Sequence, residues 1–238
     1  MMNRTNFLTA SVAALFSLQA MGQTVDEIVN KHVAALGGMD KLNSVKTLVM
    51  QRSFSIQGMD IPSKTTYILG RGMRSESVVM GNSMIQVIDG TSGWMIRPAM
   101  MGGTGDPEDM PAELLKQQLG QADPFPLANY KEKGTTVELV GKEKVDKKDA
   151  YHLKVTPKGG QPMDEYLDAD TYLLSKVQQT VNGQPGAATF SNYKATDGIQ
   201  FPGTTEVEAG QMGTLTFTTE KVTVNPSVSE AMLKKGSK

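Results

Sequence analysis

The chain has 238 residues, 24 basic and 25 acidic side chains, a formal net charge of −1 and no cysteine. A chain so close to neutral has no electrostatic footprint for nucleic acid, because such binding depends on neutralising phosphates. Without cysteine, a disulfide framework and a lipid anchor on an N-terminal cysteine are both excluded.

The N-terminus has the three parts of a secretory signal peptide. Arg4 precedes an apolar stretch, and the small residues Ala20 and Gly22 follow it at a cleavage-site spacing. That stretch is shorter than the roughly 20 apolar residues of a spanning helix. We therefore expect residues 1–22 to be removed, and residues 23–238 to form one domain, since single β domains reach about 250 residues. We expect the protein to be periplasmic, to act as a monomer and not to span the membrane.

The first element after this segment is an amphipathic helix. Thr24 and Glu27 have the spacing of a capping box, and Gly37 with Gly38 provides the stop. A short second helical turn is expected in "MDKLNSV". The apolar stripe of the first helix comprises Val25, Ile28, Val29, Val33 and Leu36.

From Lys46 onward the pattern alternates, which is typical of strands. Leu48, Met50 and Phe54 lie on one face of the first run, and similar alternation recurs in "YHLKV" and "YLLSKVQQTV". Glycine-rich and Asn-Gly or Asp-Gly turns separate the runs. The count of runs predicts about eleven short strands in a single large, curved antiparallel sheet, so the fold class is α+β and mainly β.

Residues 98–129 interrupt the β pattern. Asp109 and Pro111 suit the start of a short helix. Its apolar side would comprise Leu114, Leu115 and Leu119. A loop of this length inside a domain is usually functional or mobile, and a lid is one common case. A smaller helical segment is expected at the C-terminus, where Met232 and Leu233 can dock.

Catalytic and metal-binding patterns are weak. His32 and His152 are expected to face solvent or a rim, and neither has metal-ligand spacing. The acidic "DPEDM" lacks the spacing of a calcium loop, and no G-x-S-x-G elbow occurs. We therefore expect no enzyme activity, no metal site and no cofactor.

Methionine is abundant, with 16 in the chain. It can line a surface that adapts to varied apolar ligands, or fill an irregular core. A methionine-coordinated copper site is a third alternative. Those in or near the loop-rich segment are Met80, Met84, Met95, Met100, Met101 and Met110.

The stretch "VIDGTSGWMIRP" resembles the periplasmic lipoprotein carriers of the LolA/LolB type. The matching turn-motif positions are Asp89, Gly90, Trp94 and Pro98. Upstream, "YILGRGMRSES" is similar to the family's arginine-containing turn, with Arg71 at the arginine position and glycine in place of the family's proline. "YLDADTYLLSKVQ" and "NYKATDGIQFPGTTEVE" resemble its late strands, so the similarity covers most of residues 24–226.

The resemblance implies a half-barrel whose concave face is covered by helices around a cavity for acyl chains. It also implies that Arg71 latches the 98–129 segment as a lid. The expected activity is that of a non-catalytic carrier of lipoproteins or other lipids, with envelope proteins as further partners. The alternative is a structural or interaction module with a filled cavity. The residues expected to line the cavity are Leu48, Met50, Phe54, Trp94, Met100, Met101, Leu114, Leu115 and Leu119.

Overall fold

The computed structural model describes residues 23–56, 59–181, 183–208 and 213–236. The signal peptide expected at residues 1–22 lies outside the described residues. No helix within these described ranges is long and apolar enough to cross a membrane.

The chain begins with helix α1 (Val25–Leu36), as the sequence predicts. The capping box is present: Thr24 Oγ1 accepts from the Glu27 amide at 3.2 Å, and Glu27 Oε2 accepts from the Thr24 amide at 3.0 Å. Gly37 ends the helix with φ 132°, and a Cβ at this position would lie 2.3 Å from the Gly198 carbonyl oxygen. Only glycine fits so close to that backbone, and α2 (Met39–Ser44) follows directly.

In the described part of the chain, thirteen antiparallel strands form one sheet, in the order β6-β5-β4-β3-β2-β1-β15-β14-β11-β10-β9-β8-β7. A separate two-stranded sheet comprises β12 (Lys194–Thr196) and β13 (Ile199–Phe201). The strands of the large sheet are β1 (Thr47–Ile56), β2 (Met59–Ile68), β3 (Gly72–Val79), β4 (Asn82–Asp89), β5 (Ser92–Ile96), β6 (Glu108–Asp109), β7 (Thr136–Val145), β8 (Lys148–Thr156), β9 (Met163–Asp168), β10 (Leu174–Val181), β11 (Gln184–Ser191), β14 (Thr204–Glu208) and β15 (Thr214–Val224).

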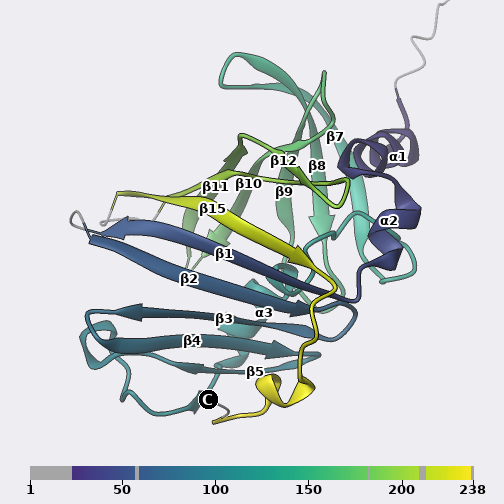
Figure 1. Ribbon diagram of the computed structural model, residues 1–238. Helices are drawn as coiled ribbons and strands as arrows, with labels where there is room; N and C mark the ends of the chain where they lie inside the picture. Colours follow the sequence, from purple (N-terminus) through teal and green to yellow (C-terminus); the bar gives the residue numbers. More distant parts are fainter. Residues whose placement is uncertain (1–22, 57–58, 182, 209–212, 237–238) are drawn as a thin grey trace, which may run out of the picture.

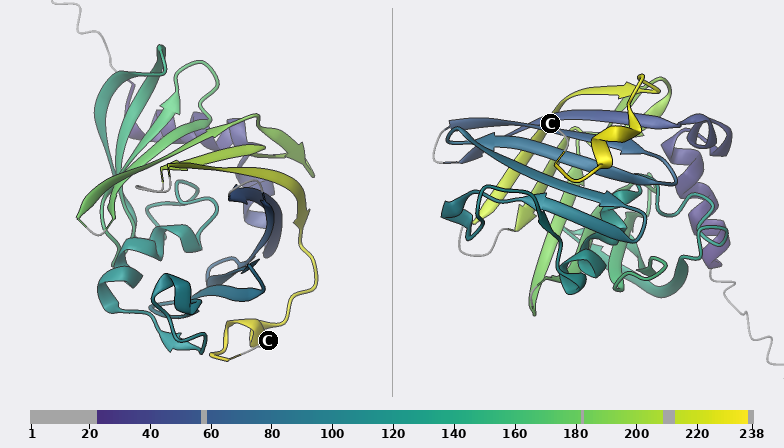
Figure 2. Two further views of the ribbon diagram at one scale, coloured as in Figure 1. Left: turned by 90° about the vertical axis from the view of Figure 1, so that its left-hand side faces the viewer. Right: turned by 90° about the horizontal axis from the view of Figure 1, so that it is seen from below.

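The sheet is strongly curved and not closed, because its two edge strands are β6 and β7 (Figure 1). The prediction of one large antiparallel sheet is therefore confirmed. Its strand count exceeds the expected eleven, in part because the two-residue β6 is too short to show alternation. The chain between β5 and β7 lies inside the curve of the sheet (Figure 2).

That inner segment contains three short helical elements, η1 (Ala99–Met101), α3 (Ala112–Gln118) and η2 (Leu119–Ala122). The predicted short helix after Pro111 is thus confirmed as α3. At the C-terminus, η4 (Glu230–Leu233) is a single 3-10 turn that packs beside β3 and β4.

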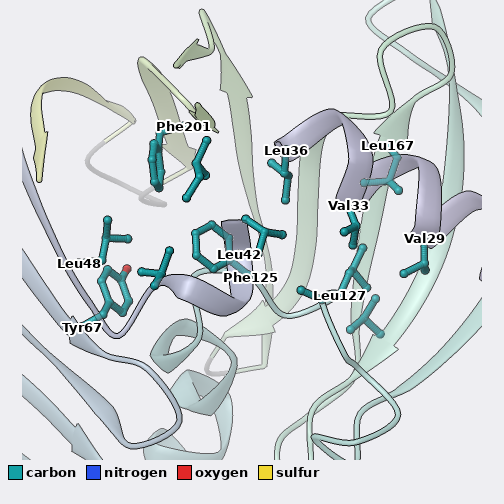
Figure 3. Packing of buried hydrophobic residues seen from close by; sticks show 14 of the residues in the cluster. Val29, Val33, Leu36, Leu42, Leu48, Tyr67, Phe125, Leu127, Leu167 and Phe201 are labelled. Carbon is teal, nitrogen blue, oxygen red and sulfur yellow. The ribbon is translucent and has the colours of Figure 1, made fainter. Parts of the chain in front are cut away.

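The main core lies between the concave face of the sheet, α1 and the inner segment (Figure 3). Ile28 of α1, Leu48 of β1 and Leu153 of β8 are fully buried in it. Leu127 and Phe125 bring the inner segment into the same cluster. Helix and inner segment together cover the concave face.

His32 is also part of this interface, so the expectation that it faces solvent is wrong. The side chain is buried, and its Nδ1 lies 2.7 Å from the Tyr172 carbonyl oxygen. Burial lowers the pKa of His32 and favours the neutral ring, although the hydrogen bond to Tyr172 opposes this. The physical reason is helical spacing, because His32 lies four residues from both Ile28 and Leu36 on the buried face.

Candidate ligand-binding cavity

Strand register decides which side chains face the concave side. Leu48 pairs with Tyr67, Met50 with Thr65, and so on along β1 and β2. Because successive side chains alternate, Leu48, Met50, Arg52 and Phe54 share the concave face. The Arg52 guanidinium therefore lies on the same face of the sheet as three apolar side chains.

A cavity of about 170 Å³ lies between this face and the inner segment. Strands β9, β10, β11 and β14 supply its opposite wall. Its lining is mainly apolar, with a few polar side chains among aromatic and proline residues. The lining residues are His32, Leu36, Met50, Arg52, Tyr67, Pro124, Phe125, Pro126, Glu165, Leu174, Phe190, Tyr193, Gln200, Phe201, Pro202 and Thr205.

Arg52 supplies the positive charge in the lining. Its Nη2 lies 3.5 Å from Met50 Sδ, and its Nε is buried with no hydrogen-bond partner among the described residues. Burial raises the pKa of Tyr67, and the nearby Arg52 guanidinium partly offsets that rise. The guanidinium and the Tyr67 hydroxyl are therefore close together at one side of the cavity.

Glu165 supplies a carboxyl to the lining from β9. It is 2% exposed. Burial, with a smaller contribution from the Asp123 charge, raises the pKa of Glu165 to about 7. Asp123 itself pairs with Lys133 at 2.6 Å, so its charge is balanced locally.

Tyr193 completes the polar part of this wall. Its hydroxyl donates to the Leu174 carbonyl oxygen at 2.8 Å. Burial and the neighbouring Glu165 raise the pKa of Tyr193, so this hydroxyl stays protonated. The hydroxyl proton of Tyr193 is therefore already used in a hydrogen bond, whereas Arg52 Nε has no acceptor among the described residues.

The residues expected to line the cavity fall into separate places. Met50 lines it, and Leu48 is buried in the main core beside it. The side chains at positions 114, 115 and 119 are partly buried against the same core. Phe54 lies on the concave face but in a second cluster with Ile61, Val79 and Phe217. Ligand binding by these side chains stays a prediction.

The expectation that Trp94, Met100 and Met101 line the cavity is wrong. Met100 and Met101 are 58% and 38% exposed on the η1 turn after Pro98. Trp94 is buried, but it pairs with Val87 in the register of the convex face. Its cluster contains Val87 and Leu233 and is separate from the core around the cavity.

The C-terminal turn explains why a tryptophan is buried on the convex face. Trp94 Nε1 donates to the Leu233 carbonyl oxygen at 2.8 Å. Arg74 donates to the Met232 carbonyl oxygen at 3.1 Å, and its guanidinium lies 5.7 Å from the centre of the Trp94 ring. We call this contact of η4 with β3, β4 and β5 the C-terminal clasp (Figure 1). The predicted docking of the C-terminal segment is confirmed.

Arg71 belongs to the clasp and not to a lid. Its Nε donates to Asp89 Oδ1 at 3.1 Å, and its Nη1 donates to Glu230 of η4. The hydrogen bond with Asp89 is the main cause that raises the pKa of Arg71. The predicted latch on residues 98–129 is therefore wrong. The motif hairpin is as expected: Gly90 has φ 60° between β4 and β5, and it donates to the Arg71 carbonyl oxygen.

His152 lies on the convex side of β8, as its place in the alternation predicts. Its two ring nitrogens lie 2.7 Å from Glu143 Oε1 and 2.8 Å from Asp164 Oδ1. Burial lowers the pKa of His152, but the hydrogen bonds with Asp164 and Glu143 outweigh burial and raise it above the usual 6.5. No set of three potential metal ligands is present within the described part of the chain.

A larger, shallower depression of about 340 Å³ lies on the convex face of β1 to β4. Its side chains include Gln51, Lys64, Glu76 and Val78, and the salt bridge between Lys64 and Glu76 is 3.4 Å long. The wall is partly exposed and charged. The smaller concave cavity is the better candidate, because it is less open, it lies between the sheet and the inner segment, and its walls are mainly apolar.

The same architecture occurs in solved structures. A LolA superfamily protein from Nitrosomonas europaea superimposes with a TM-score of 0.59 over 90% of this chain and 99% of its own, at 13% identity. This chain has a LolA-like fold. A DUF1329 family protein from Desulfovibrio piger gives 0.57 over 88% and 97%, at 18% identity.

A third structure with the LolA-like fold is an outer membrane lipoprotein-sorting protein domain from Vibrio parahaemolyticus. Its TM-score is 0.51, over 87% of this chain and 94% of that domain, at 18% identity. No family model and no curated protein matches the sequence. At these identities the likeness concerns the fold.

Arg52 and Glu165 line the cavity but are not among the residues predicted from the sequence. A signal was present, because Arg52 lies between Met50 and Phe54 at the inward spacing of β1. Glu165 likewise lies two residues before Leu167, which is fully buried. A charged residue at an inward position of an alternating strand is a candidate for a functional group.

Proposed function

We propose that this protein is a non-catalytic carrier of the cell envelope that holds an acyl chain of a lipid or lipoprotein in its concave cavity. The observation that carries the proposal is the 170 Å³ cavity with a mainly apolar lining inside an open LolA-like sheet. Burial of each CH₂ group contributes roughly 0.8 kcal/mol to binding. One acyl chain therefore binds with a useful affinity and can still dissociate, as a carrier requires. The periplasm is the proposed location.

This chain shares its fold with the Vibrio parahaemolyticus domain, which is named for lipoprotein sorting. That name supports lipids and lipoproteins as the class of ligand. The alternative function, an interaction module with a filled interior, predicts a concave face without free volume. The cavity between Met50, Phe125 and Phe201 favours the carrier.

The test is native mass spectrometry of the purified protein, first as isolated and then after delipidation and incubation with acyl-chain probes. We expect bound lipid in both cases. Met50→Glu places a charge in the cavity and should abolish uptake. Gln51→Glu is the matched control. Gln51 follows Met50 in β1, and its side chain is exposed on the opposite face of the sheet.

Thermal melting of both variants shows whether each remains folded. Uptake of probe by a folded Met50→Glu protein at the level of the control would contradict binding in this cavity. The absence of any lipid on the unchanged protein under all these conditions would contradict the carrier function itself.

A further inference from the structure

We infer that the cavity is built for a single-chain carboxylate, a free fatty acid, whose head group binds the Arg52 guanidinium. This inference rests on the proposed carrier function and narrows its ligand class. It is carried by the position of Arg52 in a mainly apolar cavity, where its buried Nε has no hydrogen-bond partner among the described residues, and by the size of that cavity.

The hydrogen-bonding state of Arg52 points to a ligand. Its Nε is buried without a partner, and it forms no ion pair with a carboxylate of the described chain. A buried polar group without a partner destabilises the fold, so such a group in a lining points to a missing ligand atom. A guanidinium presents a planar fork of donors that matches a carboxylate. The Tyr67 hydroxyl lies beside it as a second donor.

The charge in the rest of the lining also affects an anionic head group. An incoming carboxylate meets Glu165 in the same cavity, and two ionised carboxylates would repel each other. Burial raises the pKa of Glu165 to about 7, so below that pH the group is mostly a neutral donor. Asp123 is paired with Lys133. The cavity therefore keeps a positive balance around Arg52.

The volume of the cavity limits the size of its ligand. A water-sized group needs roughly 10–15 Å³ of cavity volume. The 170 Å³ cavity thus holds on the order of a dozen non-hydrogen atoms. This matches one medium-length chain with its head group. The two or three acyl chains of a phospholipid or lipoprotein exceed it several-fold.

The experiment is isothermal titration of the purified, delipidated protein with dodecanoate and with methyl dodecanoate at pH 6.5. Both have the same chain, but only dodecanoate carries a charge. We expect dodecanoate to bind at least about ten-fold more tightly, as charge-assisted hydrogen bonds do. Arg52→Gln should remove this preference by weakening dodecanoate binding to about the level of methyl dodecanoate, and thermal melting shows whether the variant is folded.

Lys221→Gln is the matched control. It removes one positive charge from an exposed position on the convex side of β15, next to Gln51, and should leave the preference intact. Equal affinity of the unchanged protein for the two probes overturns the inference and leaves the carrier function standing. Failure of both probes to bind overturns the carrier function and the inference together. The comparison on the unchanged protein tests the inference even if Arg52→Gln does not fold.

Discussion

Glu165→Gln should stabilise the folded protein above neutral pH and change little in acid. The group has a pKa of about 7 when folded and 4.5 as its usual value. Because the pKa is raised on folding, the folded protein binds this proton more tightly than the unfolded chain does. The free energy of unfolding is therefore unaffected by this group below pH 4.5, and it falls as the pH rises from 4.5 through 7. Each pH unit between these values is worth about 1.4 kcal/mol, so the total loss is roughly 3 kcal/mol.

The assay is urea unfolding of the unchanged protein and of Glu165→Gln at pH 4 and pH 8.5. Glutamine keeps the size of the side chain and removes its charge, so the variant should be more stable by roughly 3 kcal/mol at pH 8.5 and about equal at pH 4. The difference between the two proteins isolates Glu165 from His32 and His152. Glu138→Gln, at an exposed position of β7, is the control and should change stability by less than about 0.5 kcal/mol. An equal effect of Glu165→Gln at both pH values would refute a carboxyl whose pKa is raised by burial.

Three further predictions concern the outer contacts. Leu233→Ala removes a buried side chain of the C-terminal clasp, so the emission of Trp94 should shift to longer wavelength and stability should fall by about 2–4 kcal/mol; an unchanged spectrum would contradict the clasp. Arg71→Gln should speed hydrogen exchange in residues 230–233 and leave exchange in α3 unchanged. Faster exchange confined to α3 would instead support a latch between Arg71 and residues 98–129. The pKa of His152 is raised, so its stabilising effect is present below pH 6.5 and lost as the pH rises through the raised value. His152→Gln should flatten this dependence in urea unfolding, and an unaltered profile would count against the two carboxylate contacts.

Local patterns predicted the elements well, because each depends on neighbours in sequence. The capping box at Thr24 and the Asp89-Gly90 hairpin both form as expected. The large antiparallel sheet follows from alternation with short turns. These features need no knowledge of which distant segment covers which face.

The site depended on long-range contacts and was predicted less well. Alternation shows that a strand has an apolar face, but not that both faces of β5 are covered. Trp94 was assigned to the cavity because nothing near it in sequence reveals that Leu233 covers the convex side. Methionines at 100 and 101 lie on an exposed turn, where their flexibility gives no directional signal.

The most direct test of an acyl chain in the cavity uses methionine methyl groups as reporters. The protein is labelled with [¹³C-methyl]methionine and titrated with a dodecanoate that carries a nitroxide at the end of its chain. Met50 lines the cavity, whereas Met100 is 58% exposed on the η1 turn. The account predicts strong broadening of the Met50 methyl signal at equimolar ligand with Met100 unchanged. Broadening of Met100 while Met50 stays sharp would show surface binding and contradict the carrier cavity.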